Sequence, residues 1–145
     1  MNTHKRNINP VHEKFFEDVK MLGIITKEGN ITFLRSLKSC LLYDFRTKKD
    51  WSISLQTKDC KYYFYIYEFQ ESERPLSHYL YETHCAGYDL LPEFSGATFI
   101  WLLKGEAANT EKLLEIKRTI EEMDIVESVI EITADQIWCK DHIVF

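Results

Sequence analysis

The chain has 145 residues, of which 45% are hydrophobic, 14% aromatic and 28% charged, with 5 glycines and 3 prolines. This composition excludes disordered, collagen-like and low-complexity chains, which lack the apolar residues of a packed core. The length predicts a single domain over 1–145, with a flexible N-terminal tail at 1–8. The sequence has no apolar run of the roughly 20 residues that a bilayer-spanning helix needs. Its basic start precedes no apolar stretch, so we expect no signal peptide and a cytoplasmic protein.

Charge and motifs narrow the classes of function. The chain carries 18 Lys and Arg against 23 Asp and Glu, a formal net charge of −5. Nucleic acids are polyanions that bind basic surfaces, so direct nucleic-acid binding is disfavoured and a basic protein partner is favoured. The five glycines are isolated and form no phosphate-binding loop, and we expect no cofactor. The cysteines show no CxxC spacing and are expected to be reduced: Cys40, Cys60, Cys85 and Cys139.

The first half of the chain predicts one helix followed by an antiparallel meander. A helix is expected over 10–22, because Val11, Phe15, Val19 and Leu22 form one apolar stripe. Alternating apolar residues predict the strands that follow, joined by loops too short for crossovers. These strands are expected at 24–26, 31–37, 41–45, 51–55 and 61–69, with a hairpin loop at 47–50 and a turn at 57–59.

The second half predicts a short helix and then a β-α-β-β unit. The short helix is expected over 76–83 and an ordered loop over 88–95. The unit comprises a strand at 97–103, a helix at 110–123 capped by Asn109 or Thr110, and strands at 126–133 and 137–144. Its rhythm, ATFIWLLKG and then DIVESVIEIT, resembles small regulatory ligand-binding domains of the ACT and leucine-responsive-regulator type. The fold class is therefore α+β, a single mainly antiparallel β-sheet with two or three helices packed on it and a C-terminal unit of ferredoxin-like character.

Histidine and cysteine side chains could supply chemistry only if the fold brings them together. His78, His84 and Cys85 lie within HYLYETHC, and His142 and Cys139 are the groups that could join them. A zinc site needs four ligands, and a nucleophilic thiol needs an imidazole within reach. No metal-binding spacing or family signature surrounds these residues, so a structural role is favoured and we expect no metal.

The aromatic run KYYFYIYEF is the least usual feature of the sequence. Such a strand can fill a core between sheet and helices, form a protein interface, or stack on unpaired bases. Acidic residues follow it in a loop, and a second acidic group ends the predicted helix at 110–123, where it opposes the helix dipole. The candidate partner-binding residues are Tyr63, Tyr65, Tyr67, Glu71, Glu73, Glu121, Glu122 and Asp124.

These observations favour a non-enzymatic module that binds a protein and inhibits or regulates it, as an immunity protein, antitoxin or phage-encoded inhibitor does. An acidic surface suits a basic partner such as a nucleic-acid-processing enzyme or toxin. One alternative is a small-ligand-sensing domain with a pocket or homodimer interface around 97–133. Another is an enzyme that uses His84, Cys85 or His142.

Overall fold

The computed structural model describes residues 10–145, so the tail predicted at 1–8 lies outside the described residues. In the described part, six strands form one antiparallel sheet in the order β2-β3-β4-β7-β1-β8. The helices are α1 (Pro10–Phe16), α2 (Asn30–Leu41) and α3 (Thr110–Glu121). The strands of the sheet are β1 (Val19–Thr26), β2 (Arg46–Gln56), β3 (Lys61–Gln70), β4 (Ser77–Glu82), β7 (Phe99–Lys104) and β8 (Val126–Ile132).

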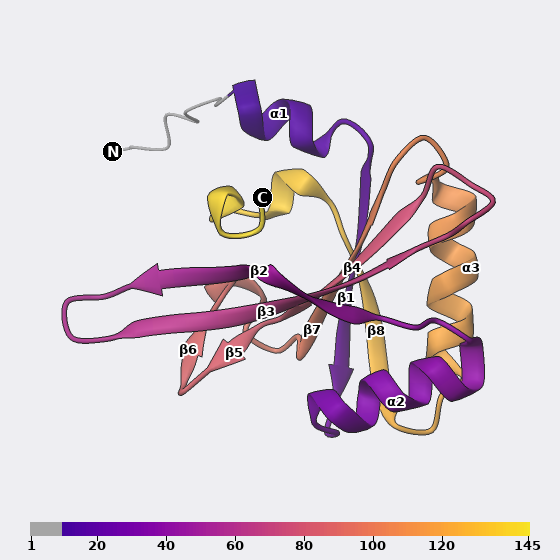
Figure 1. Ribbon diagram of the computed structural model, residues 1–145, viewed down its shortest axis with the longest axis horizontal. Coiled ribbons are helices and arrows are strands. Elements are labelled where there is room, and N and C mark those ends of the chain that lie inside the picture. The colour runs from indigo at the N-terminus through magenta and orange to yellow at the C-terminus, as the bar shows by residue number, and fades with distance from the viewer. Residues whose placement is uncertain (1–9) are drawn as a thin grey trace.

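The sheet is covered on both faces (Figure 1). Helices α2 and α3 pack on one face, against a cluster that includes Leu80 and Trp101. Helix α1 and the C-terminal segment pack on the other face, against a cluster that includes Tyr81 and Leu102. Successive residues of a strand point to opposite faces, so the three central strands β1, β4 and β7 supply apolar side chains to both clusters.

Shorter elements complete the second face and the chain end. A two-stranded hairpin of β5 (His84–Cys85) and β6 (Tyr88–Asp89) follows β4, and the Tyr88 ring stacks on Tyr62 of β3 with 4.6 Å between centroids. Three short 3₁₀ turns are η1 (Pro92–Phe94), η2 (Ala134–Gln136) and η3 (Lys140–His142). None of the described helices is both long and apolar enough to cross a bilayer.

The predicted α+β class is confirmed, with one mainly antiparallel sheet and three α-helices in the described residues. The strand at 61–69, the strand at 97–103, the helix at 110–123 and the strand at 126–133 are confirmed as β3, β7, α3 and β8. The predicted cap is also present, because the Asn109 side chain accepts the backbone N–H of Lys112 at 2.8 Å.

The predicted helix over 10–22 is wrong in its second half, because the helix ends at Phe16 and β1 begins at Val19. The apolar spacing that suggested one stripe continues into a strand whose central residues are buried on both faces. The strands predicted at 31–37 and 41–45 are also wrong, since α2 occupies Asn30–Leu41. Phe33 and Leu37 are spaced by four residues and form its buried stripe, a spacing that strand alternation also allows.

Three further segments have a different secondary structure from the one predicted. The loop at 47–50 is part of β2, where the register with β3 shifts between Thr47 and Ser52. The short helix at 76–83 is the strand β4, buried on both faces because it lies between β3 and β7. The strand predicted at 137–144 is an irregular segment with one 3₁₀ turn, η3, so the C-terminal unit is β-α-β without a second hairpin strand.

Candidate functional site

Two of the three tyrosines predicted to bind a partner are half exposed to solvent, and the third is buried. Tyr63 and Tyr65 are 48% and 52% exposed, whereas Tyr67 is only 6% exposed. All three lie on the same face of β3, because they are two residues apart. Helix α2 accounts for the difference: the amide of Asn30, at its start, donates to the Tyr67 hydroxyl oxygen at 3.1 Å. The β2–β3 hairpin extends beyond the helices and leaves the other two rings uncovered (Figure 1).

Tyr67 has a structural role beneath α2. Its hydroxyl donates to Glu82 Oε2, which also accepts from the Asn30 amide at 2.7 Å. Burial, with the adjacent Glu82 carboxylate, raises the pKa of Tyr67 far above its ordinary value of 10.0. A neutral, buried and fully bonded phenol is not available to a partner, so Tyr67 is removed from the contact surface.

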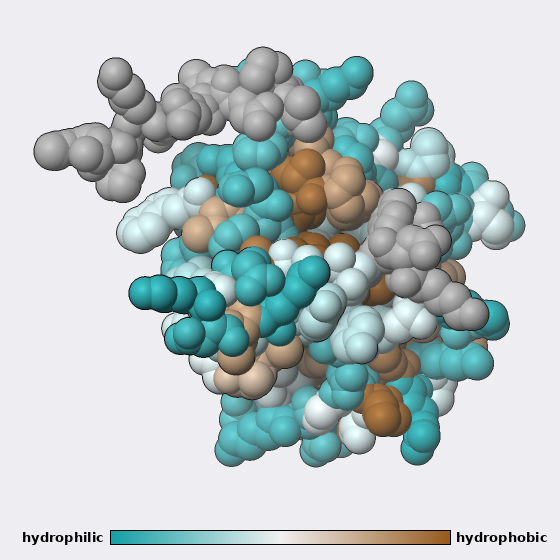
Figure 2. Space-filling model, turned by 60° about the vertical axis from the view of Figure 1, so that its left-hand side comes forward, coloured by the Kyte–Doolittle hydropathy of each residue, from teal (hydrophilic) through white to brown (hydrophobic). Residues whose placement is uncertain are grey.

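The surroundings of the open tyrosines are polar. Ser52 and Ser54 of β2 face Tyr65 and Tyr63 in the register of the hairpin, and the Lys61 ammonium lies 5.7 Å from the Tyr63 ring centroid. Hydrophilic residues cover most of this side of the molecule, and hydrophobic residues appear in small areas (Figure 2). Two aromatic rings in such a setting are typical of a protein interface with a polar rim.

Glu71 and Glu73 lie at the opposite end of β3, in the loop that leads to β4. They line a groove of about 370 Å³ between the end of α2, this loop and the first turn of α3. The loop packs closely against the backbone of Gly105, where a Cβ would come within 2.1 Å of the Pro75 carbonyl oxygen. The groove is lined by Leu41, Leu42, Tyr43, Phe69, Glu71, Ser72, Glu73, Arg74 and Lys112.

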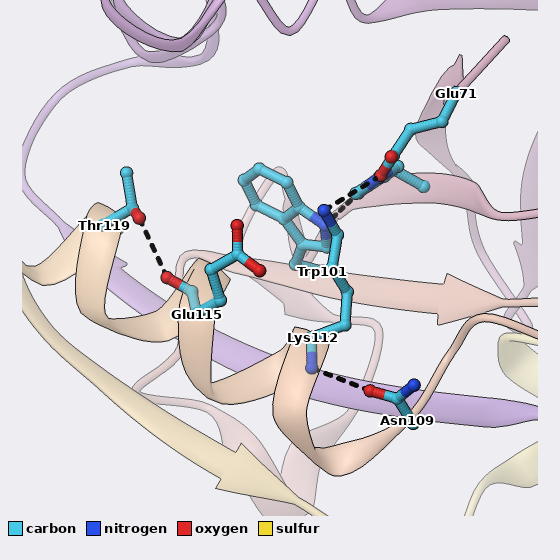
Figure 3. A network of polar contacts seen from close by, with 7 residues as sticks. Glu71, Trp101, Asn109, Lys112, Glu115 and Thr119 are labelled. Carbon is cyan, nitrogen blue, oxygen red and sulfur yellow. Dashed lines mark hydrogen bonds and ion pairs between the residues drawn. The ribbon is translucent and has the colours of Figure 1, made fainter. Parts of the chain in front are cut away.

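A buried chain of polar contacts supports Glu71 from below the groove. His78 is fully buried in β4, and its Nδ1 accepts the indole N–H of Trp101 at 3.1 Å. That bond leaves Nε2 as the protonated nitrogen, which donates to Glu71 Oε2 at 2.6 Å. The same oxygen lies 3.4 Å from the Lys112 ammonium, whose side chain reaches from α3 toward Glu71 beside Trp101 (Figure 3).

The electrostatics of this network favour an ionised Glu71 and a neutral His78. Burial alone would raise the pKa of Glu71, but the hydrogen bond from His78 and the charge of Lys112 outweigh it and lower the pKa. Burial lowers the pKa of His78 despite the neighbouring carboxylate. Burial, together with Glu71 and Glu115, raises the pKa of Tyr43, which stays a neutral phenol.

The acidic residues at the end of α3 lie apart from both the hairpin tyrosines and the groove. Glu121, Glu122 and Asp124 are all exposed, and Glu121 forms an ion pair with Lys117 at 3.7 Å. The chain continues from them into β8, the edge strand farthest from β2. The eight predicted partner-binding residues therefore occupy three separate places, with Tyr67 buried.

His84 and His142 have different hydrogen-bond partners in the fold. His84 Nδ1 lies 2.5 Å from Asp89, and His142 Nδ1 lies 2.7 Å from the Leu90 carbonyl oxygen. Burial and two nearby carboxylates raise the pKa of the Cys139 thiol. Within residues 10–145, no group of three or more His, Cys, Asp or Glu side chains is arranged to hold a metal ion.

The groove with its buried network was not predicted from the sequence. The sequence places His78 in the short helix expected over 76–83, whereas in the structure it is fully buried in a central strand of the sheet. Its neighbours come from β7, α3 and the β3–β4 loop, so no local pattern could reveal them. A single histidine inside the apolar stretch HYLY was the only available signal.

Comparison of the chain with protein-family models, with curated proteins and with solved structures finds no match.

Proposed function

We propose that this protein is a non-enzymatic module that binds another protein and inhibits or regulates it. The observation that carries the proposal is the pair of half-exposed rings, Tyr63 and Tyr65, on the projecting β2–β3 hairpin. Tyrosine is enriched at interfaces because it contributes a large amphipathic contact area at a low cost in side-chain entropy. A strand position that needed only solubility would carry a small polar residue, as Ser52 and Ser54 do opposite these rings.

Charge supports a basic partner. The net charge of −5 gives the molecule a field that accelerates encounters with a positively charged surface. An enzyme or toxin that processes nucleic acid presents such a surface, and a module of the immunity-protein or antitoxin kind would cover it. This charge effect acts on the association rate, whereas the tyrosines would control how long the complex lasts.

The test is photo-crosslinking in cells, with a crosslinking amino acid at Tyr63 or, in a second chain, at Ser54. We expect both positions to capture the same basic protein. The double variant Tyr63→Ser, Tyr65→Ser should weaken its binding to the purified partner at least tenfold, because two anchor side chains are lost.

A matched control variant is Ile130→Ser, which removes an apolar side chain 39% exposed on β8, at the other edge of the sheet. It should leave binding unchanged. Equal losses in the two variants, or capture of unrelated proteins at the two hairpin positions, would refute the hairpin as the interface.

A second candidate function is small-ligand sensing by a ferredoxin-like domain. Its support is the order β4-β7-β1-β8, with α2 and α3 packed in the same core cluster, an arrangement typical of a split β-α-β fold. The groove volume also lies in the range of ligand pockets. Of its lining residues only Lys112 falls within 97–133, the region where the sequence suggested a pocket. A melting-temperature screen with amino acids and nucleotides tests this candidate, because a ligand that binds the folded state raises the melting temperature.

A further inference from the structure

We propose that the groove beside Glu71 receives an arginine side chain of the partner protein, next to an apolar residue of the same segment. The inference rests on the proposed function and adds a second contact, at the end of β3 away from the hairpin tyrosines. Four features of the groove support it.

The first feature is a carboxylate oxygen without a partner in the described part of the chain, on Glu71, a residue that lines the groove. Glu71 Oε2 receives both His78 and Lys112, whereas Oε1 has no partner among the described residues. Lys112 is only 11% exposed and already paired, so it is not free to meet a ligand. The unmet group is an ionised carboxylate oxygen, and its complement is a cationic hydrogen-bond donor.

The second feature is the rigidity of that carboxylate. His78 and Trp101 are both fully buried and use their ring N–H groups in one chain that ends at Glu71. Burying such a network costs desolvation, which solvated carboxylates elsewhere on the surface avoid. The network holds Glu71 in one orientation, so a ligand would meet a preorganised acceptor.

The third feature is Leu42, which combines two unfavourable properties at the rim. Its backbone is left-handed, with φ of 60°, and its side chain is 79% exposed. Glycine would make the same turn without strain and without exposing an apolar group. The leucine is explained if its side chain contacts an apolar residue of the partner.

The fourth feature is the aromatic wall. The Tyr43 ring packs 5.4 Å from the His78 ring and lines the groove. A planar guanidinium can stack on such a ring while it donates to Glu71 and to Glu73, which also lines the groove. An ammonium lacks both the plane and the paired donors, so arginine is favoured over lysine. Arg74 also lines the groove, and its positive charge repels an incoming cation. Removal of this charge should therefore strengthen the binding of an arginine.

The experiment is an NMR titration of the full chain with the peptide acetyl-Gly-Arg-Leu-Gly-amide. We expect it to shift the backbone amides of Tyr43, Ser72 and Lys112. The matched peptide with citrulline, a neutral isostere of arginine, should bind about tenfold more weakly. Equal binding of the two peptides, or stronger binding of a peptide with glutamate at that position, would overturn the inference.

Three protein variants extend the test. Glu71→Gln should weaken the arginine peptide about tenfold, and Leu42→Gly about threefold. Arg74→Ala should strengthen it about twofold, because a like charge is removed. Weaker binding of the arginine peptide by Arg74→Ala would show that the groove does not favour a cation and would overturn the inference. The peptide comparison uses the unaltered protein, so it remains decisive even if Glu71→Gln fails to fold.

The outcome is separable from that of the proposed function. Tyr63→Ser, Tyr65→Ser should leave peptide binding unchanged, because these residues lie at the other end of β3. Loss of partner binding in that variant with intact peptide binding supports both proposals. A peptide that does not bind, with partner binding still dependent on the tyrosines, refutes the groove alone.

Discussion

At the scale of single residues, the same side-chain type has opposite roles according to what covers it. Tyr65 and Tyr67 are two positions apart on one face of β3, yet one is half exposed and the other is bonded to Asn30 and Glu82. The alternation of the strand predicts that they share a face. Only the position of α2 decides which of them a partner can reach.

Leu42 permits a direct test of strain at this scale. Leu42→Gly should raise the free energy of unfolding by about 0.5–1 kcal/mol, because relief of the left-handed backbone exceeds the added entropy of the unfolded chain. Chemical denaturation measures this change. Leu42→Ala is the control, since it removes the exposed side chain but keeps the strained backbone. Equal stabilities of the two variants would show that the backbone at this position is not strained.

At the scale of elements, the buried network joins β4, β7, α3 and the β3–β4 loop through His78. Unfolded His78 takes up a proton near its ordinary pKa of 6.5, whereas burial keeps its pKa lower in the fold. Between these values the unfolded state binds more protons, so stability falls as the pH falls. The lowered pKa of Glu71 acts in the same direction, but only below its ordinary value of 4.5.

We therefore expect the protein to be less stable at pH 5.5 than at pH 7.5, with a His78 contribution of up to about 1.4 kcal/mol. His78→Gln keeps a donor and an acceptor but does not titrate, so the pH dependence should become weaker by this amount. Urea denaturation at both pH values measures it. His84→Gln, at an exposed histidine, should retain the His78 contribution; a pH dependence that His78→Gln leaves intact would contradict the assignment.

Elements differ in how far the sequence predicts them. Helix α3 has a cap at Asn109 and an unambiguous apolar stripe, and β7 is an uninterrupted apolar run, so both were predicted. Strand β4 and helix α2 were not, because an apolar residue every three or four positions fits either state when tertiary contacts decide. The sequence left open whether the tyrosines of β3 are exposed, because exposure depends on which helices cover each face of the strand. The groove was not predicted, because Glu71, His78 and Lys112 meet only after β4 pairs between β3 and β7.

At the scale of the whole molecule, two apolar clusters share one sheet. Leu80 contributes to the cluster under α2 and α3, and Leu102 to the cluster under α1 and the C-terminal segment. Both residues have no exposed surface and lie on the adjacent strands β4 and β7. The clusters are separated only by the thickness of the sheet, so loss of packing on one face should destabilise strands that the other face needs.

We expect Leu80→Ala and Leu102→Ala each to lower the free energy of unfolding by about 2–5 kcal/mol, because each leaves a cavity in a fully buried site. In a chain with Trp51 and Trp138 replaced by Phe, fluorescence reports Trp101, which lies in the cluster with Leu80. If the molecule unfolds as one unit, Leu102→Ala shifts the Trp101 transition as much as Leu80→Ala does, and circular dichroism follows the same curve. If Leu102→Ala leaves the Trp101 transition in place, the two faces unfold independently.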